Sequence, residues 1–471
     1  MPARTAFLFP GQGSYLPGLF GTLAGHHPLI DESLSIVDEV GAGLGRAPVS
    51  PMLLDPGSPT LQDLVEHDPP ALHLAIFASS VIAFRLLAEE YRIRPDLLLG
   101  HSFGELTALT AAGALTLEDG AYLVAQRDES LRRIEAPRGG LVAVNCGAKQ
   151  AHDIIGALDE WDLAVAADNS PGQVVVSGPD AELARFQEVA AALELTATRL
   201  RIPYPFHNGI LADTADDFGA RVADVPKRVP RLPVYSALLG RYLHDVAEVE
   251  QVISGHLVMP VRFLDAAREI HADGARRFVE CGPKGVLVDL VAAIVPDATT
   301  VAPLRRRTDR RGFEADLSGL TPSERAGRAT VSLRRAPSSR VAATTAGPVV
   351  EPGSGSPAPR RAEPDPRPSE PSEPKVPSAG TDREAVFDTV RSVYADLLGY
   401  PPDALEPDAD LEADLGIDSI KQTEAFTRTL EHFGIPPAES GTRLTNYPTM
   451  DAIVDLVLRL RKGRHPVGSD A

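Results

Sequence analysis

The sequence has few cysteines and few aromatic residues. Cys146 and Cys281 are the only cysteines among 471 residues, and both lie in apolar stretches that we interpret as a strand and a strand end. Such positions favour buried, unpaired thiols over a disulfide, which suits a reducing cytosol. Aromatic residues make up only 5% of the chain, but hydrophobic residues reach 43%, which is enough for a substantial core.

Long apolar runs and positive charge are also scarce. No apolar run approaches the length of a membrane span, and the N-terminus lacks the apolar region of a signal peptide. The short apolar stretch 5–10 runs into glycines, which is typical of a first core strand. The net charge of −19 argues against nonspecific binding to nucleic acid, which needs a basic surface. We therefore expect a soluble cytoplasmic protein that binds neither membrane nor nucleic acid.

Residues 321–380 differ sharply from the sequence on either side. They contain twelve prolines, a single leucine (Leu333) and no Phe, Tyr or Trp. Such a segment buries too little apolar surface to offset its chain entropy, so we predict a disordered, semi-extended linker. Its net charge is +3, against −14 for residues 1–320 and −8 for residues 381–471. The chain thus divides into a large domain, a linker, a small acidic domain over 381–462 and a tail over 463–471.

The large domain, residues 1–320, is predicted to be an α/β fold with a mostly parallel sheet. An insertion at about 135–202 has the order β-α-β-β-α-β, which is that of ferredoxin-like units. Its strand-like stretches are 140–146, 163–167, 173–177 and 195–202, and its helical stretches are 149–158 and 181–193. In the small domain, helical stretches at about 382–398, 419–433 and 449–462 predict an all-α bundle.

A candidate nucleophile lies in the motif Gly100-His101-Ser102-Phe103-Gly104. This G-x-S-x-G motif stands between a predicted strand, 96–100, and a predicted helix starting at Glu105, a context in which a sharp turn presents the serine hydroxyl outward. A serine nucleophile needs a base, usually histidine, and spacing does not choose among the twelve histidines. His207 follows the insertion, at a subdomain junction where clefts form. From the residues alone, a structural histidine remains an equally good interpretation.

Further motifs accompany Ser102 and His207 along the chain. They are Phe9-Pro10-Gly11-Gln12-Gly13, Arg127 in a helical stretch, Asn169-Ser170-Pro171, Gly255-His256-Leu257 with Pro260-Val261-Arg262-Phe263, and Glu280-Cys281-Gly282-Pro283. In this order they resemble the malonyl-CoA:acyl carrier protein acyltransferase family, which includes polyketide synthase acyltransferase domains. The resemblance covers roughly residues 5–305 and implies an α/β-hydrolase-like body.

The resemblance also implies roles for individual residues. Ser102 would take an acyl group from coenzyme A as an ester, with His207 as its base. Backbone N–H groups of Gln12 and Phe103 would hold the oxyanion. Arg127 would bind the distal carboxylate of a malonyl-type group.

Phe206 and His101 would complete the substrate site, and no metal ligands are implied. Bulky Phe103 and Phe206 resemble the pocket residues of malonyl-selective members. Three departures leave the acyl group open: Pro69 stands where glutamine is common, His256 replaces Asn or Gln, and residues 208–210 differ from the more common S-P-L.

A second candidate serine, Ser419, begins the predicted helix 419–433. From its neighbours alone it is equally well interpreted as a helix N-cap. However, Leu415-Gly416-Ile417-Asp418-Ser419-Ile420, within an acidic three-helix domain, resembles acyl carrier proteins over about residues 382–462. This implies covalent 4′-phosphopantetheine on Ser419, a phosphopantetheinyl transferase that Asp418 helps to recruit, and an acidic docking face along residues 422–431.

The sequence thus predicts an acyltransferase joined to its own carrier domain, in polyketide or related biosynthesis. It would load malonyl, or a close dicarboxylic relative, from coenzyme A onto Ser419 or onto a partner carrier. Ketosynthase or other synthase modules would act in trans. An acyl hydrolase is the alternative, against which Arg127 argues, and a noncatalytic scaffold is a third hypothesis.

Overall fold

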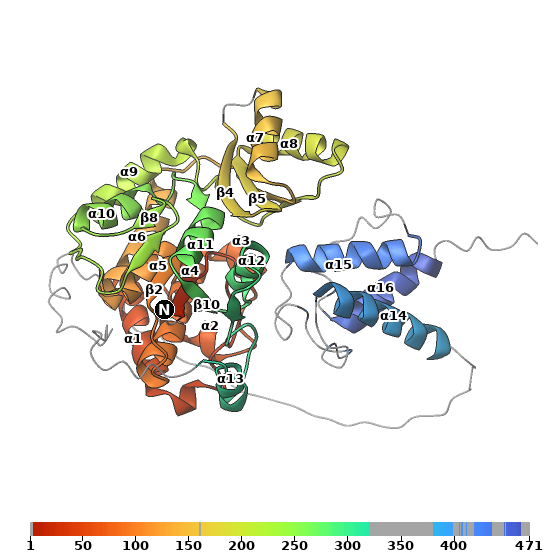
Figure 1. The fold of residues 1–471 in the computed structure, drawn as a ribbon, viewed down its shortest axis with the longest axis horizontal. Helices are drawn as coiled ribbons and strands as arrows, with labels where there is room; N and C mark the ends of the chain where they lie inside the picture. Colours follow the sequence, from red (N-terminus) through yellow and green to blue (C-terminus); the bar gives the residue numbers. More distant parts are fainter. Residues whose placement is uncertain are drawn as a thin grey trace, which may run out of the picture.

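A six-stranded sheet forms the centre of the large domain (Figure 1). In spatial order its strands are β11 (Thr299–Val301), β10 (Ala275–Glu280), β1 (Arg4–Phe9), β2 (Leu97–Gly100), β7 (Val234–Ser236) and β8 (Arg241–Tyr242). All neighbouring strands are parallel except β7 and β8. Strand β2 is wholly buried and apolar, as in parallel sheets covered by helices on both faces. The predicted α/β fold with a mostly parallel sheet is confirmed.

The computed structural model describes most of the two domains. The described residues are 3–159, 162–320, 380–398, 405, 407, 411, 419–435, 447 and 449–462. The predicted linker, apart from Gly380, and the predicted tail lie outside them.

Helices and short helical turns surround the central sheet. They are η1 (Ala24–His26), α1 (Pro28–Gly43), α2 (Ser50–Leu54), α3 (Leu61–His67), α4 (Pro69–Arg85), η2 (Leu86–Glu90), α5 (Gly104–Ala111), α6 (Leu117–Arg133), η3 (Gly209–Leu211), α9 (Ala212–Arg221), α10 (Val246–Gly255), α11 (Phe263–Ala272), α12 (Val286–Ile294) and α13 (Arg310–Asp316).

One helical run corrects an expectation from the sequence. Pro69–Glu90, which joins α4 and η2, is long and apolar enough to cross a membrane by length and composition. The prediction that no apolar run reaches this length was therefore wrong. The whole apolar window is nevertheless buried inside the fold, as expected for the core helix of a globular domain.

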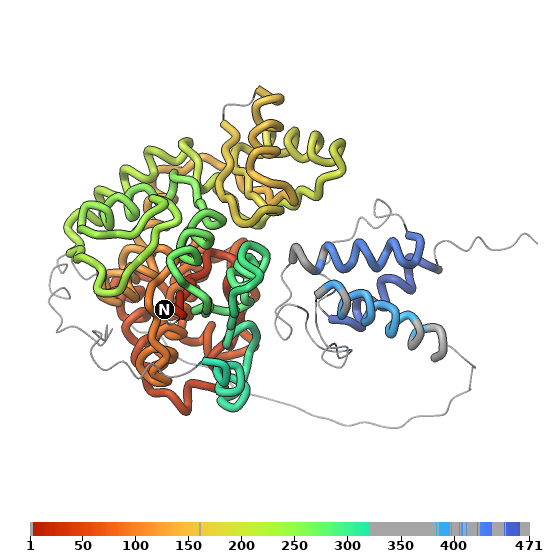
Figure 2. The backbone as a smooth tube through the Cα atoms, viewed as in Figure 1, coloured from red at the N-terminus to blue at the C-terminus, as the bar shows by residue number. Residues whose placement is uncertain are grey.

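The insertion forms a separate small sheet, and Figure 2 traces the chain out into it and back. Its elements are β3 (Gly140–Val144), α7 (Ala148–Leu158), β4 (Ala164–Ser170), β5 (Gln173–Gly178), α8 (Asp180–Ala192) and β6 (Ala197–Arg199). The strand order β6-β3-β5-β4, antiparallel throughout, is that of a ferredoxin-like unit. Strand β9 (Val261–Arg262), from the main body, adds in parallel beside β4. This strand was not predicted, because two residues carry no readable periodicity.

The small domain contains the three predicted helices, α14 (Gly380–Leu398), α15 (Ser419–His432) and α16 (Met450–Lys462). All three contribute to one hydrophobic core, for example through Val390, Phe426 and Val454. The predicted all-α bundle is confirmed. Both cysteines of the chain are buried and unpaired, as the sequence indicated.

Candidate active site

Ser102 lies on a tight turn between β2 and α5. Its backbone φ of 55° is in the left-handed region, which is the strained conformation of a nucleophile turn. A side chain at Gly100 would clash with the backbone of Glu105, and one at Gly104 would clash with the backbone of Phe9. The two glycines therefore let the strand, the turn and the helix approach closely enough to form this turn.

His207 lies directly opposite Ser102. The distance from Ser102 Oγ to His207 Nε2 is 2.6 Å, and His207 Nδ1–H donates to the carbonyl of Met259 at 2.7 Å. Burial lowers the pKa of His207 to about 3, and the nearby His101 and Arg127 act in the same direction. The imidazole is therefore neutral near pH 7, with an Nε2 lone pair facing the serine hydroxyl, as a general base requires.

The loop after β1 lies against this turn. A Cβ atom at Gly11 would lie 3.3 Å from the His101 carbonyl oxygen and 3.9 Å from Ser102 Cβ. The backbone N–H groups of Gln12 and Phe103 donate no hydrogen bond to any other group in the described part of the chain. Both N–H groups are thus available to an oxyanion beside Ser102.

Arg127, on α6, is buried at 2% exposure. Its guanidinium carbon lies 4.5 Å from the ring centre of Phe206 and 5.7 Å from that of Phe103. Arg127 Nε–H donates to His256 Nε2 at 2.9 Å, and Nη1–H donates to Asp128 Oδ1 at 3.2 Å. Burial lowers the pKa of Arg127, and Asp128 opposes this shift.

His256 is a neutral acceptor for Arg127. Burial, followed by the charge of Arg127 and the proximity of His207, holds the pKa of His256 well below its usual range. Its ring packs edge-on against Phe218 at 5.9 Å. His256, which departs from the family's usual Asn or Gln, therefore contacts Arg127 rather than His207. The neighbouring main-chain carbonyls of Leu257 and Met259 accept hydrogen bonds from His207.

His101 is tied to the inserted subdomain. Its Nε2–H donates to Asn169 Oδ1 at 2.7 Å, and the Asn169 amide donates to Gln173 Oε1 at 3.2 Å. Its ring packs against Phe263 at 5.3 Å. Burial lowers the pKa of His101, so a neutral ring is expected. This histidine thus joins strand β4 to the turn that carries Ser102.

The sequence analysis missed three residues at or beside the site: His73, Asp128 and Glu105. His73, on α4, contacts Asp128 Oδ1 through Nδ1 at 2.7 Å and the Gln12 amide through Nε2 at 2.9 Å. Glu105 accepts from Ser236 Oγ at 2.7 Å and from the Leu238 N–H at 3.0 Å, which fastens α5 beside β7. A histidine isolated within an apolar helix and a carboxylate directly after Arg127 were the signals available in the sequence.

Ser419 is the first residue of α15. The first turn of this helix carries no acidic side chain, and the partial positive charge of a helix N-terminus favours a phosphate. The position thus fits the phosphate of a phosphopantetheine group. Glu424 and Glu431, from the predicted docking face, are exposed on α15, whereas Asp418 lies outside the described residues.

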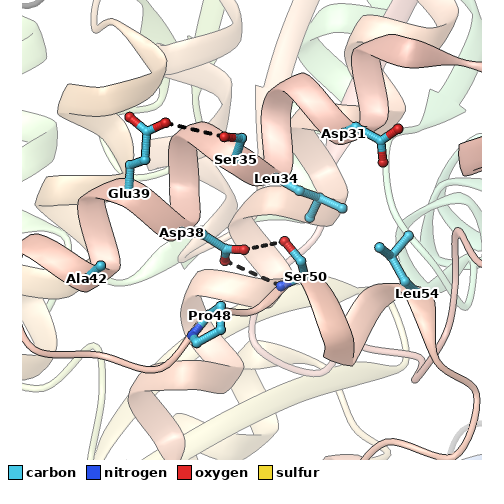
Figure 3. A pocket seen from close by; sticks show the side chains of 9 residues that line it. All are labelled: Asp31, Leu34, Ser35, Asp38, Glu39, Ala42, Pro48, Ser50 and Leu54. Atoms are coloured by element: carbon cyan, nitrogen blue, oxygen red, sulfur yellow. Dashed lines mark hydrogen bonds between the residues drawn. The ribbon is translucent and has the colours of Figure 1, made fainter.

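A separate pocket of about 480 Å³ lies between α1 and α2 (Figure 3). It is lined by Asp31, Leu34, Ser35, Asp38, Glu39, Ala42, Pro48, Ser50 and Leu54. Asp38 accepts from the Val49 N–H at 2.6 Å and from the Ser50 hydroxyl, so its carboxylate holds the start of α2. No histidine lines the pocket, so it lacks a serine–histidine pair like that of Ser102 and His207.

Two family models match separate parts of the chain. The family model described as acyl transferase domain matches residues 6–321, and the model described as phosphopantetheine attachment site matches residues 388–457. Polyketide synthase GfsA from Streptomyces halstedii is 33% identical over 287 residues, which are 60% of this chain and 4% of that protein. Mycoketide-CoA synthase from Mycobacterium tuberculosis is 32% identical over 306 residues, 64% of this chain and 7% of that protein. The chain therefore spans only a small part of the length of these relatives.

Solved structures share the fold of the large domain. The acyltransferase domain from the second module of the salinomycin polyketide synthase has a TM-score of 0.59 at 30% identity, covering 68% of this chain and 73% of that chain. Malonyl-CoA:acyl carrier protein transacylase from Xanthomonas oryzae pv. oryzae has a TM-score of 0.61 at 27% identity, covering 68% of this chain and 99% of that chain.

Proposed function

The chain belongs to the acyl transferase domain family through residues 6–321 and carries a phosphopantetheine attachment domain over residues 388–457, and on this basis we propose that it transfers a malonyl-type acyl group from coenzyme A to a carrier protein. The transfer proceeds through an ester on Ser102. The observation that carries the proposal is the 2.6 Å contact between Ser102 Oγ and the neutral His207 imidazole.

In the first half-reaction, Ser102 Oγ attacks the thioester carbonyl of the acyl-CoA. His207 Nε2 takes the hydroxyl proton as the C–O bond forms, and the backbone N–H groups of Gln12 and Phe103 hold the oxyanion. Each such donor typically contributes about 3–4 kcal/mol. The C–S bond then breaks, His207 returns its proton to the leaving thiolate, and the acyl ester remains on Ser102.

In the second half-reaction, the thiol of a carrier protein attacks the Ser102 ester. His207 Nε2 takes the thiol proton and then passes it to Ser102 Oγ as the C–O bond breaks. Covalent 4′-phosphopantetheine supplies this thiol when it is attached to a carrier domain. Ser419, at the N-terminus of α15, is the proposed attachment point on this chain.

Arg127 selects the acyl group. Its buried guanidinium is paired with Asp128 through Nη1, and the end formed by Nη1 and Nη2 can bind the distal carboxylate of the substrate through two hydrogen bonds. Phe103 and Phe206 flank it and narrow the space for a branch on the acyl chain. Both features favour malonyl or a close dicarboxylic relative, and the test below includes a neutral acyl group.

The proposed partners follow from the two half-reactions. A phosphopantetheinyl transferase must prime Ser419, and a ketosynthase or other synthase module must consume the loaded acyl group. The acceptor is either the chain's own carrier domain or a partner carrier. The buried, unpaired cysteines suit a reducing cytoplasm.

A brief incubation with malonyl-CoA, followed by intact-mass measurement, tests the proposal. A malonyl ester that persists in the protein, is absent from Ser102→Ala, and moves to the primed carrier domain supports it. Rapid release of free malonate would instead indicate an acyl hydrolase. Equal loading of the carrier domain in Ser102→Ala would show that Ser102 is not the transferring residue, and in Ser419→Ala the Ser102 ester should form normally without carrier loading.

A further inference from the structure

Arg127 is held in a closed ring of four side chains. Its Nη1–H donates to Asp128 Oδ1 at 3.2 Å, and the same oxygen accepts from His73 Nδ1–H at 2.7 Å. The other ring nitrogen of His73, Nε2, lies 2.9 Å from the amide end of Gln12. The Gln12 amide in turn reaches Arg127, at 2.9 Å from Nη2 and 3.3 Å from Nη1. The ring joins the loop after β1 to helices α4 and α6.

The partners determine the orientation of the Gln12 amide. Its neighbours are Arg127 Nη1 and Nη2 and His73 Nε2, and the guanidinium nitrogens can only donate. The amide oxygen must therefore face Arg127, and His73 Nε2–H then donates to the same oxygen. Both ring nitrogens of His73 thus face acceptor oxygens, Nδ1 that of Asp128 and Nε2 that of Gln12, and each donates in this arrangement.

One oxygen atom thus accepts from three N–H groups, two of Arg127 and one of His73. Arg127 Nε–H already donates to His256. The end of the guanidinium formed by Nη1 and Nη2 is therefore the edge that can bind a planar carboxylate. The amide oxygen of Gln12 occupies this end. The backbone N–H of the same residue is the proposed oxyanion donor beside Ser102, so Gln12 spans the two ends of a short dicarboxylic acyl group.

We propose that the Gln12 amide oxygen marks the position of the substrate's distal carboxylate, and that His73, held by Asp128, is a further specificity-determining residue that donates to this carboxylate beside Arg127. The proposal rests on the proposed function and extends it. The carboxylate displaces the Gln12 amide and meets the same three donors. A neutral acyl group displaces nothing and gains nothing from His73.

The test compares malonyl-CoA with acetyl-CoA in the full chain, by the initial rate of Ser102 ester formation. His73→Phe keeps a ring beside Phe103, where the two rings now lie 5.7 Å apart, but removes both donors. It should lower kcat/KM for malonyl-CoA about tenfold or more, since a hydrogen bond to a charged group is lost, and leave acetyl-CoA within about twofold. Asp128→Asn should act in the same direction. The double variant should be no worse than the more severe single variant, because the two residues act as a unit.

Two matched substitutions provide the controls. His152→Phe, on α7, and Asp216→Asn, on α9, change exposed residues of the same types and should leave both rates unchanged. Gln12→Ala keeps the backbone N–H but removes the displaced amide, so it should lower the KM for malonyl-CoA relative to that for acetyl-CoA.

The outcomes separate this inference from the proposed function. If the unmodified protein forms no malonyl ester, the proposed function fails. If it forms the ester but His73→Phe and Asp128→Asn keep the malonyl-to-acetyl ratio, only the role of His73 is overturned. If His73→Phe loses activity toward both substrates, His73→Gln, which keeps N–H donors, is the deciding variant. Restored malonyl transfer in His73→Gln supports the proposal, and an unchanged ratio of malonyl to acetyl transfer contradicts it.

Discussion

His207 is oriented by a main-chain carbonyl, that of Met259, which accepts from its Nδ1–H at 2.7 Å. No carboxylate in the described part of the chain is hydrogen-bonded to this imidazole. The proposed base therefore lacks the acidic third member of a triad, and its tautomer depends on a backbone dipole. Burial keeps the imidazole neutral by lowering its pKa, although the contact with Met259 opposes this shift, and Nε2 faces the Ser102 hydroxyl.

His207→Gln should remove nearly all of the transfer activity. Glutamine can still contact Ser102 but cannot take its proton, so ester formation from malonyl-CoA should slow by about a thousandfold or more. Rapid quenching followed by intact-mass measurement gives the rate. The exposed His244→Gln is the matched control and should retain the original rate. Retention of activity in His207→Gln would remove His207 from the mechanism.

Arg127→Ala should reverse the acyl-group preference. Loss of the guanidinium removes at least two hydrogen bonds to a charged carboxylate, so kcat/KM for malonyl-CoA should fall about 100-fold. Transfer from acetyl-CoA should be nearly unchanged, because a neutral acyl group forms no charged hydrogen bond with the guanidinium. Arg127→Lys should not restore malonyl transfer, since an ammonium cannot reproduce the two-pronged contact. An equal fall for both substrates would indicate a structural role for Arg127.

Gly104→Ala should destabilise the large domain. The added methyl group would overlap the backbone of Phe9, and strands and helices in this part of the core have little room to move apart. We expect a loss of about 3 kcal/mol in the free energy of unfolding, measured with urea. Gly172→Ala is the control, because nothing lies within 4 Å of its Cβ position, and it should change stability by less than about 0.5 kcal/mol.

Glu105 should make the stability of the large domain depend on pH. Burial raises its pKa to about 7, although the contacts with Ser236, Leu238 and Ala237 oppose the shift. Between the ordinary value, 4.5, and about 7, the folded state holds a proton that the unfolded state has lost. The contribution of this group to stability therefore falls as pH rises through that window, with a slope of at most about 1.4 kcal/mol per pH unit.

Glu105→Gln provides the measurement for this pH effect. The unfolding free energy of the unmodified protein minus that of the variant should decrease from pH 5 to pH 7 and then level off. Taking the difference removes the contribution of Glu280, whose pKa burial raises to about 8. The exposed Glu188→Gln should show no such trend. A difference that stays constant over this range would mean that Glu105 is already ionised at pH 5.

Much of the fold was readable from local patterns. Strand β2 is a short apolar run next to a glycine turn, and helices α7 and α8 have clear helical spacing, so their positions were predicted closely. The order β-α-β-β-α-β led directly to the ferredoxin-like sheet. Strand β9 and the burial of the apolar run Pro69–Glu90 could not be predicted, because both depend on neighbours far away in the sequence.

The sequence by itself determined which residue types are present and in what order: Ser102 in its glycine turn, a histidine after the insertion, and an arginine on a predicted helix. Only the tertiary structure decided which histidine meets which partner. His207 faces Ser102, whereas His73 and His256 surround Arg127, although all three are buried imidazoles. The physical reason is that hydrogen bonds and charge act over a few ångströms, and only folding brings α4, α6 and the loop after β1 within that range.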